Sequence, residues 1–173
     1  MAQRHIYILD TCVLLHDPKS LFKFQNNDVY LPLAVIDDLD DQKARKEAVA
    51  ASAREVFRQL KPLNLDQIGD EGIPLNKEGG KLFIYNHDKQ SETPNITRMN
   101  SDNALIVCCL VLQAKFPDQK VTIVTKDTGL RVRAAAYGCL TENYRSDLIE
   151  DGIYSGVRYI TTTLIPTEAK VEV

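Results

Sequence analysis

Short apolar runs and segments of helical composition alternate along most of this chain. Runs rich in β-branched and aromatic residues are typical of buried strands, and they lie at 6–9, 28–33, 81–85, 121–125 and 139–141. Helical signals lie between them, from residue 34 onward and at 46–60, 101–115 and 127–137. Because parallel strands need long crossovers, usually helical, this order predicts an α/β fold. We expect a three-layer sandwich with a mostly parallel central sheet and helices on both faces.

Other segments carry weaker signals. Asp17-Pro18 predicts a helix start, with Asp17 as the cap and Pro18 in the first turn. Residues 61–80 are rich in Pro, Gly, Asn and charge, which predicts a long irregular loop. Residues 157–164 are rich in strand formers. We therefore expect one domain over residues 1–150 and a C-terminal β extension over 151–173, which packs on that domain or leads to another.

Composition excludes several other classes of protein. The 173 residues are 44% hydrophobic and 26% charged, as in soluble globular domains. No apolar run approaches the roughly 18 residues needed to span a membrane, and the first residues lack the pattern of a secretory signal. The four cysteines form no C-x-x-C pair, and the three histidines lack zinc-ligand spacing. We expect a cytoplasmic protein with reduced thiols and no membrane association.

Two aspartates stand where strands meet helices. Asp10 directly follows the first strand, and Asp127 follows the strand at 121–125 by two residues and begins a helix. Ligands of open α/β sheets bind beyond the carboxyl ends of the strands, so both positions suit a functional site. Each is also an ordinary place for a helix cap, and for Asp127 taken alone the cap is the simpler interpretation.

Two further acidic positions lie on predicted helices. Asp102 shares a helix face with Leu105, Ile106 and Cys109, and a carboxylate on such an apolar stripe is costly unless it is paired or holds a cation. In the run 37–41, Asp37 and Asp41 fall opposite the apolar stripe and are expected to be solvated. Asp38 and Asp40 flank the stripe, and helical geometry alone leaves the choice between them open.

Several carboxylates in one cleft would require either protonation or a divalent cation. Two of them about 4 Å apart repel by a few kcal/mol at an effective dielectric near 20. Ligation by oxygen alone, without His or Cys, is what Mg²⁺ or Mn²⁺ prefers. Ions held in this way activate water and stabilise phosphoryl displacement. Such a cluster also lowers the net charge, so the value of −3 does not argue strongly against a nucleic-acid substrate.

Four motifs, in order and with matching spacing, resemble the PIN domain. They are Ile8-Leu9-Asp10-Thr11, Val35-Ile36-Asp37-Asp38-Leu39-Asp40, Ser101-Asp102-Asn103-Ala104-Leu105-Ile106 and Val124-Thr125-Lys126-Asp127-Thr128-Gly129-Leu130-Arg131. Within that family the chain is most similar to the N-terminal PIN module of PhoH-like proteins. That similarity rests on Asp17-Pro18, on the middle loop with Gly79-Gly80 and on Tyr154-Ser155-Gly156-Val157.

The resemblance implies an endoribonuclease that uses Mg²⁺ or Mn²⁺ to hydrolyse single-stranded RNA, leaving a 5′-phosphate and a 3′-hydroxyl. Asp10, Asp102 and Asp127 match the acidic residues of the family, and its helix carboxylate, usually Glu, falls on the shorter Asp38. These four are the expected catalytic and metal-binding residues. Thr11 and Thr125 match hydroxyl positions that support the carboxylates or contact phosphate.

Basic residues next to Asp127 are the expected RNA contacts. Lys126 and Arg131 adjoin this predicted ligand, and Arg133 lies close by in sequence. With Thr11 and Thr125, Lys126 and Arg131 make up the expected substrate-binding set. Isolated surface cations are more often simply solvated.

The resemblance also implies partners, and other functions can be weighed against it. PhoH-like proteins continue into an ATPase, and this sequence contains no G-x-x-x-x-G-K-[ST] motif, so an ATPase domain would belong to a longer chain. PIN proteins often form homo-oligomers. A phosphatase would need an Asp where Cys12 stands, and a phospho-receiver domain fits poorly. The stronger rival is a PIN-like fold kept as an RNA- or protein-interaction module with little or no cleavage.

Overall fold

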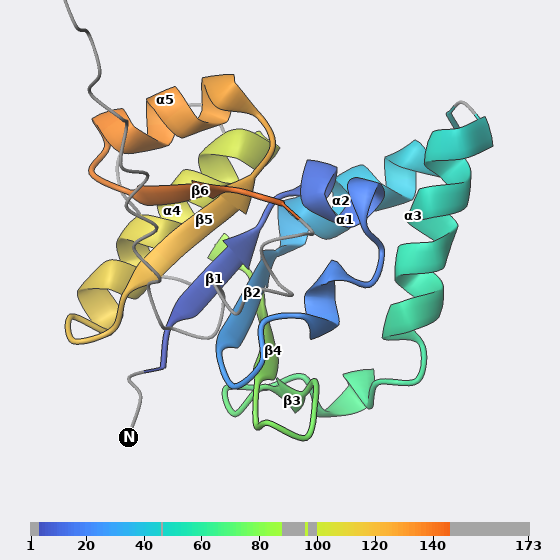
Figure 1. The fold of residues 1–173 in the computed structure, drawn as a ribbon, viewed down its shortest axis with the longest axis horizontal. Coiled ribbons are helices and arrows are strands. Elements are labelled where there is room, and N and C mark those ends of the chain that lie inside the picture. The colour runs from blue at the N-terminus through green and yellow to red at the C-terminus, as the bar shows by residue number, and fades with distance from the viewer. Residues whose placement is uncertain (1–3, 46, 88–95, 97–99, 146–173) are drawn as a thin grey trace, which may run out of the picture.

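A six-stranded sheet forms the centre of the molecule (Figure 1). The computed structural model describes residues 4–45, 47–87, 96 and 100–145. The strand order is β3-β4-β2-β1-β5-β6, and every neighbouring pair is parallel except β3 with β4. The strands are β1 Ile6–Leu9, β2 Asp28–Pro32, β3 Ile73–Pro74, β4 Lys81–Tyr85, β5 Val121–Thr125 and β6 Leu140–Asn143.

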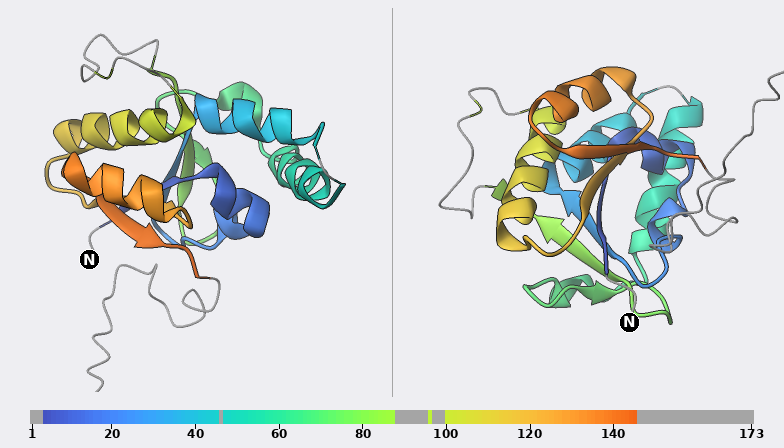
Figure 2. Two further views of the ribbon diagram at one scale, coloured as in Figure 1. Left: turned by 90° about the horizontal axis from the view of Figure 1, so that it is seen from above. Right: turned by 60° about the vertical axis from the view of Figure 1, so that its left-hand side comes forward.

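Helices cover both faces of this sheet. They are α1 Thr11–His16, α2 Leu33–Gln42, α3 Glu47–Leu60, α4 Ser101–Lys115 and α5 Thr128–Ala136, with short 3₁₀ turns at Ser20–Phe22 and Leu65–Gln67. Figure 2 shows α4 and α5 on one side and α1 and α3 on the other. The structure confirms the predicted α/β sandwich with a mostly parallel sheet. The expected C-terminal β extension lies outside the described residues.

The two middle strands explain why the core forms here. All residues of β1 and β5 are buried, as expected for parallel strands that are covered on both faces. Helix α4 is apolar nearly all round and is buried from Ala104 to Cys109, so it packs as a fully enclosed helix against β1, β2 and β5. The five parallel strands end at one edge of the sheet. The residues after β1, β2 and β5 therefore come together there.

The prediction that a helix starts at Asp17-Pro18 is wrong. Asp17 instead follows the last residue of α1. Between Asp17 and β2 the only helical element is the 3₁₀ turn at Ser20–Phe22. Its carboxylate accepts hydrogen bonds from Lys19 N (3.1 Å), Lys23 Nζ (2.8 Å) and Tyr144 Oη (2.5 Å). The side chain thus stabilises a turn and a long-range contact, which an Asp-Pro pair does as readily as it caps a helix.

Smaller differences concern the ends of elements. Asn100 caps α4, because its Oδ1 accepts from Asn103 N at 2.8 Å. The last described strand, β6, lies at the edge of the sheet beside β5. The loop at 61–80 contains a 3₁₀ turn and the two-residue β3. In the part of the chain that the structure describes, no helix is both long and apolar enough to cross a membrane.

Candidate active site

Asp10 occupies the carboxyl end of β1 and is only 7% exposed. Its amide continues the sheet ladder by donating to Val124 O at 3.1 Å. It stands at the N-cap of α1, yet its side chain makes no cap hydrogen bond. Instead Asp10 Oδ2 accepts from Thr125 Oγ1 at 2.5 Å and from Cys12 Sγ at 2.8 Å. The carboxylate is therefore held between β1 and the end of β5.

The surroundings of Asp10 do not fully compensate the negative charge of its ionised carboxylate. Burial raises the pKa of its carboxyl above the usual value, and the negative charge of Asp102 raises it further. Hydrogen bonds from Cys12 and Thr125 lower the pKa but do not cancel the rise. A cation beside Asp10 would stabilise the ionised form.

Asp38 is the helix carboxylate that turns toward this site. In α2 the side chains of Val35 and Leu39 are buried, and Asp38 is half-buried beside them. Its Oδ2 accepts from Thr11 Oγ1 at 3.3 Å, so it lies near the end of β1. Asp40 is exposed and pairs with Lys43, and Asp37 and Asp41 are exposed as expected. The structure therefore places Asp38 rather than Asp40 at the sheet edge.

Asp102 lies in the first turn of α4 and is partly exposed. Its negative charge adds to the rise in the pKa of the Asp10 carboxyl that burial causes. Its Oδ2 forms an ion pair with the guanidinium of Arg133 on α5. Arg133, which the sequence placed only near Asp127, thus supplies a positive charge to this carboxylate.

Asp127 is bound mainly as a helix cap. Its Oδ1 accepts from Gly129 N at 2.6 Å and Leu130 N at 3.2 Å, and the residue is exposed. Its amide donates to Thr125 Oγ1 at 2.9 Å, so the Thr125 hydroxyl links Asp127 to Asp10. Among the described residues, no three His, Cys, Asp or Glu side chains lie close enough together to hold a metal ion.

The expected substrate-binding residues divide into two kinds. Thr11 and Thr125 are buried. The Thr11 hydroxyl donates a hydrogen bond to Asp38, and the Thr125 hydroxyl donates one to Asp10. Of the two roles that the sequence left open, this geometry favours support of the carboxylates. Lys126 is exposed, so its ammonium is accessible to a substrate. Arg131 is half-buried, and its Nε is buried without a hydrogen-bond partner.

Cys12 is a member of the site that the sequence interpretation missed. Its Sγ donates to Asp10, accepts from Lys126 N at 3.2 Å, and lies 3.5 Å from Thr125 Oγ1. Burial, followed by the charge of Asp10, raises the pKa of this thiol to about 11, so it is protonated at neutral pH. The available signal was its position two residues after Asp10. The first turn of a helix can bring that side chain back to the cap.

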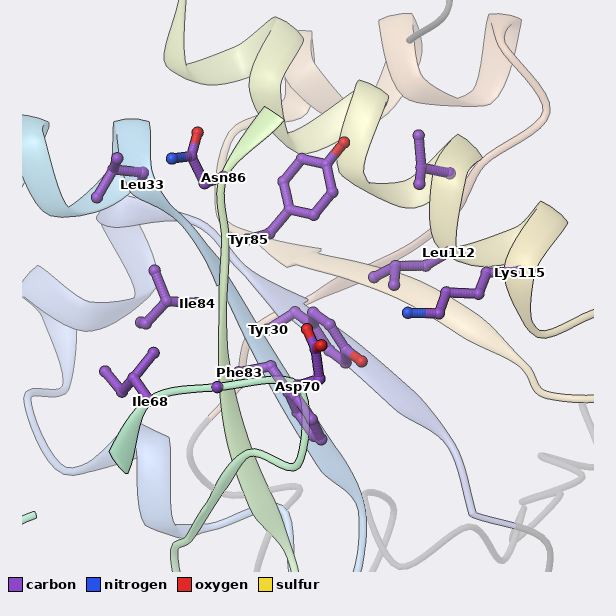
Figure 3. Close-up of a pocket in the computed structure, with 12 residues that line it drawn as sticks. Tyr30, Leu33, Ile68, Asp70, Phe83, Ile84, Tyr85, Asn86, Leu112 and Lys115 are labelled. Carbon is purple, nitrogen blue, oxygen red and sulfur yellow. The ribbon is translucent and has the colours of Figure 1, made fainter. Parts of the chain in front are cut away.

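The described cavities lie apart from these carboxylates. One of about 400 Å³ lies between β4 and the C-terminal half of α4 (Figure 3). Tyr30 and Phe83 stack in its wall with ring centroids 4.6 Å apart, and Lys115 lines it from α4. A second cavity, of about 480 Å³, is bordered by apolar side chains of α2, α3 and β4. Neither is lined by Asp10, Asp38, Asp102 or Asp127.

The donors at the sheet edge suit a hard divalent ion. Asp10, Asp38, Asp102 and Asp127 offer oxygen only, the chemistry that Mg²⁺ and Mn²⁺ prefer. Asp10 is buried beside the charge of Asp102, and a cation would relieve both the burial and the repulsion. In the structure two of these carboxylates are compensated without an ion. Asp102 forms an ion pair with Arg133, and Asp127 accepts hydrogen bonds from the first amides of α5.

Comparison with known proteins identifies the family. Residues 7–145 match the family model of the PIN domain. Protein PhoH2 of Bacillus subtilis is 33% identical over 168 residues, covering 92% of this chain and 38% of that protein. Protein PhoH2 of Mycolicibacterium smegmatis is 33% identical over 152 residues, covering 87% of this chain and 34% of that protein. The chain thus spans little more than a third of the length of these relatives.

A solved structure supports the fold independently of close sequence similarity. A domain of a functionally unknown protein from Methanocaldococcus jannaschii superimposes with a TM-score of 0.54 at 16% identity. The match covers 82% of this chain and 92% of that domain. The sequence matches confirm the resemblance to the PIN domain and to PhoH-like proteins. This chain therefore belongs to the PIN domain family, whose fold is of the nuclease type.

Proposed function

We propose that this domain is a divalent-metal-dependent endoribonuclease that hydrolyses phosphodiester bonds in single-stranded RNA. The observation that carries the proposal is the buried Asp10 carboxylate, held by two hydrogen-bond donors at a sheet edge and repelled by Asp102. A fold gains nothing in stability from such a group. An anion that is costly in the free protein is, however, well suited to bind a cation.

The residues divide into ligands, supports and substrate contacts. Asp10, Asp38, Asp102 and Asp127 would hold Mg²⁺ or Mn²⁺, and the bound ion would supply an activated water and neutralise charge on the phosphate. Thr125 orients Asp10, and Thr11 orients Asp38.

The cations near Asp127 would bind the RNA backbone. The exposed Lys126 contacts phosphate next to the carboxylates. Arg131, which is half-buried on α5, contributes a second positive charge beside Lys126. We expect a 5′-phosphate and a 3′-hydroxyl as products.

The central test is cleavage of a 5′-labelled single-stranded RNA in Mn²⁺ or Mg²⁺ by the wild type and by Asp10→Asn. Asp41→Asn is a matched control, because Asp41 is an exposed carboxylate of α2. We expect Asp10→Asn and EDTA each to abolish cleavage, with the control unaffected. Equal cleavage by Asp10→Asn and wild type, or cleavage that persists in EDTA, would refute the proposal.

A second candidate is an RNA-binding module without cleavage. It is favoured by the ion pair of Asp102 with Arg133 and by the use of Asp127 as a cap, since both satisfy carboxylates without a metal. This alternative predicts RNA binding that EDTA does not weaken and no products even at high enzyme concentration. A filter-binding assay beside the cleavage assay separates the two functions.

The relatives suggest a setting for the domain. Because they are more than twice as long as the matched region, we propose that the domain acts in the cytoplasm beside an ATPase module of the PhoH type in a longer protein. Homo-oligomers would then bring several nuclease sites to one RNA. Mass measurement of the longer protein and of this domain alone would test whether either assembles.

A further inference from the structure

We propose that Cys12 is a positioning residue whose thiol, together with the Thr125 hydroxyl, holds the Asp10 carboxylate in its metal-binding orientation. This inference rests on the proposed metal site and adds a residue to it. Two donors meet on one atom: Cys12 Sγ lies 2.8 Å and Thr125 Oγ1 lies 2.5 Å from Asp10 Oδ2. Donors that fix a ligating carboxylate raise its affinity for a metal, because less rotational freedom is lost on binding.

Comparison with Asp127 shows that Asp10 is not held as an ordinary cap. Both residues occupy the N-cap of a helix that follows a strand. Asp127 Oδ1 accepts from two backbone amides of its own helix, whereas the Asp10 side chain makes no cap bond. The thiol and the hydroxyl turn the Asp10 carboxylate toward β5. The helix thus forgoes a stabilising cap, which is expected where the carboxylate serves another purpose.

The two donors are themselves oriented by the chain that follows β5. Lys126 N donates to Cys12 Sγ at 3.2 Å, and Asp127 N donates to Thr125 Oγ1 at 2.9 Å. With these amides on their acceptor sides, the thiol and hydroxyl hydrogens are free to point at Asp10. Cys12 therefore links Asp10 to the turn that carries Lys126 and Asp127.

The test measures Mn²⁺ binding to the whole metal-free chain by isothermal titration calorimetry. Cys12→Ala removes the donor, and Cys12→Ser keeps one. Cys139→Ala is the matched control, because Cys139 is also buried but precedes β6, at the opposite end of the strands from Asp10. We expect Cys12→Ala to weaken Mn²⁺ binding about 10- to 100-fold, as loss of an outer hydrogen-bond partner does. Cys12→Ser should recover most of the affinity, and Cys139→Ala should retain it.

The outcomes separate this inference from the proposed function. If Cys12→Ala lowers the melting temperature but binds Mn²⁺ as the wild type does, Cys12 is only structural and the inference fails while the metal site stands. Equal losses in Cys12→Ala and Cys12→Ser would also overturn the donor role. If the wild type binds no Mn²⁺, both fall together. If it binds Mn²⁺ with the expected order of variants but cleaves no RNA, the ribonuclease proposal fails and the role of Cys12 stands.

Discussion

The buried carboxylate of Asp10 is suited to bind a metal, but in its ionised form it lowers the stability of the metal-free domain. Burial raises its pKa, and the charge of Asp102 adds to the rise. A group whose pKa is higher in the folded than in the unfolded state favours folding most at low pH, and this contribution is lost as pH rises through the folded-state pKa. At neutral pH the ionised Asp10 therefore destabilises the metal-free protein.

We therefore predict that Asp10→Asn raises the melting temperature of the metal-free protein at pH 7 while it abolishes cleavage. The amide keeps an oxygen for the donors Cys12 and Thr125 but carries no charge to desolvate. The gain should shrink as pH falls through the raised pKa of the wild-type Asp10 carboxyl, because the protonated group carries no charge to desolvate. Differential scanning calorimetry at several pH values measures it, with Asp41→Asn as the exposed control. A melting temperature lowered by Asp10→Asn would contradict the argument.

In the proposed metal site, Arg133 would compete with the ion for Asp102. Its guanidinium forms an ion pair with that carboxylate, which a bound divalent ion would have to displace or share. We predict that Arg133→Gln tightens Mn²⁺ binding by up to about fivefold, because a partly exposed ion pair is worth roughly 0.2–1 kcal/mol. Arg54→Gln, an equal charge change on the exposed face of α3, should have no effect. Weaker binding by Arg133→Gln would instead make Arg133 a support of the site.

At the scale of elements, the sequence predicts what periodicity encodes. Strands β1, β2, β4 and β5 and helices α2 to α5 follow from short β-branched runs and from helix formers. The prediction of a helix start at Asp17-Pro18 failed because the Asp17 carboxylate accepts a hydrogen bond from Tyr144, a residue 127 positions further along the chain. No local pattern records such a contact.

That contact gives a prediction for the joint between α1 and the end of β6. Tyr144 is fully buried and its hydroxyl donates to Asp17. Partial burial opposes ionisation of Asp17, but hydrogen bonds from Lys23 and Tyr144 outweigh it and lower its pKa. Tyr144→Phe should cost about 1.5–3 kcal/mol of unfolding free energy at pH 7, the usual value of a hydrogen bond to a charged group. Urea denaturation measures the loss.

The pH dependence of that loss checks its cause. A group with a lowered folded-state pKa contributes stability above its unfolded pKa of about 3.9, and this stability disappears as pH falls through the folded-state value. The difference between Tyr144→Phe and wild type should therefore be constant from pH 7 to 5 and should narrow below about pH 4. A difference that does not change with pH would assign the effect to packing of the ring alone.

At the scale of the whole molecule, the parallel topology puts the candidate residues at one end of the sheet, and side-chain contacts decide how they are arranged. Parallel strands end at one edge, so the sequence alone could place Asp10, Asp38, Asp102 and Asp127 at a common end of the sheet. It could not show that Arg133 pairs with Asp102 or that Cys12 donates to Asp10, although the cap at Asp127 was already the simpler interpretation of its position. Those depend on rotamers and on contacts between distant segments, which neither spacing nor composition encodes.

Binding of a divalent ion should consequently stabilise the entire domain, because the proposed ligands follow β1, lie on α2 and α4, and lie in the β5–α5 turn. An ion that binds only the folded state at a hundred times its Kd adds about 2.7 kcal/mol. For a domain of this size that raises Tm by roughly 5–10 °C. We predict this shift with Mn²⁺ in thermal melts, but not with Na⁺ at equal ionic strength and not for Asp10→Asn. An equal shift in Asp10→Asn would place the stabilising ion at another site, since the charge of Asp10 is what the proposed centre neutralises.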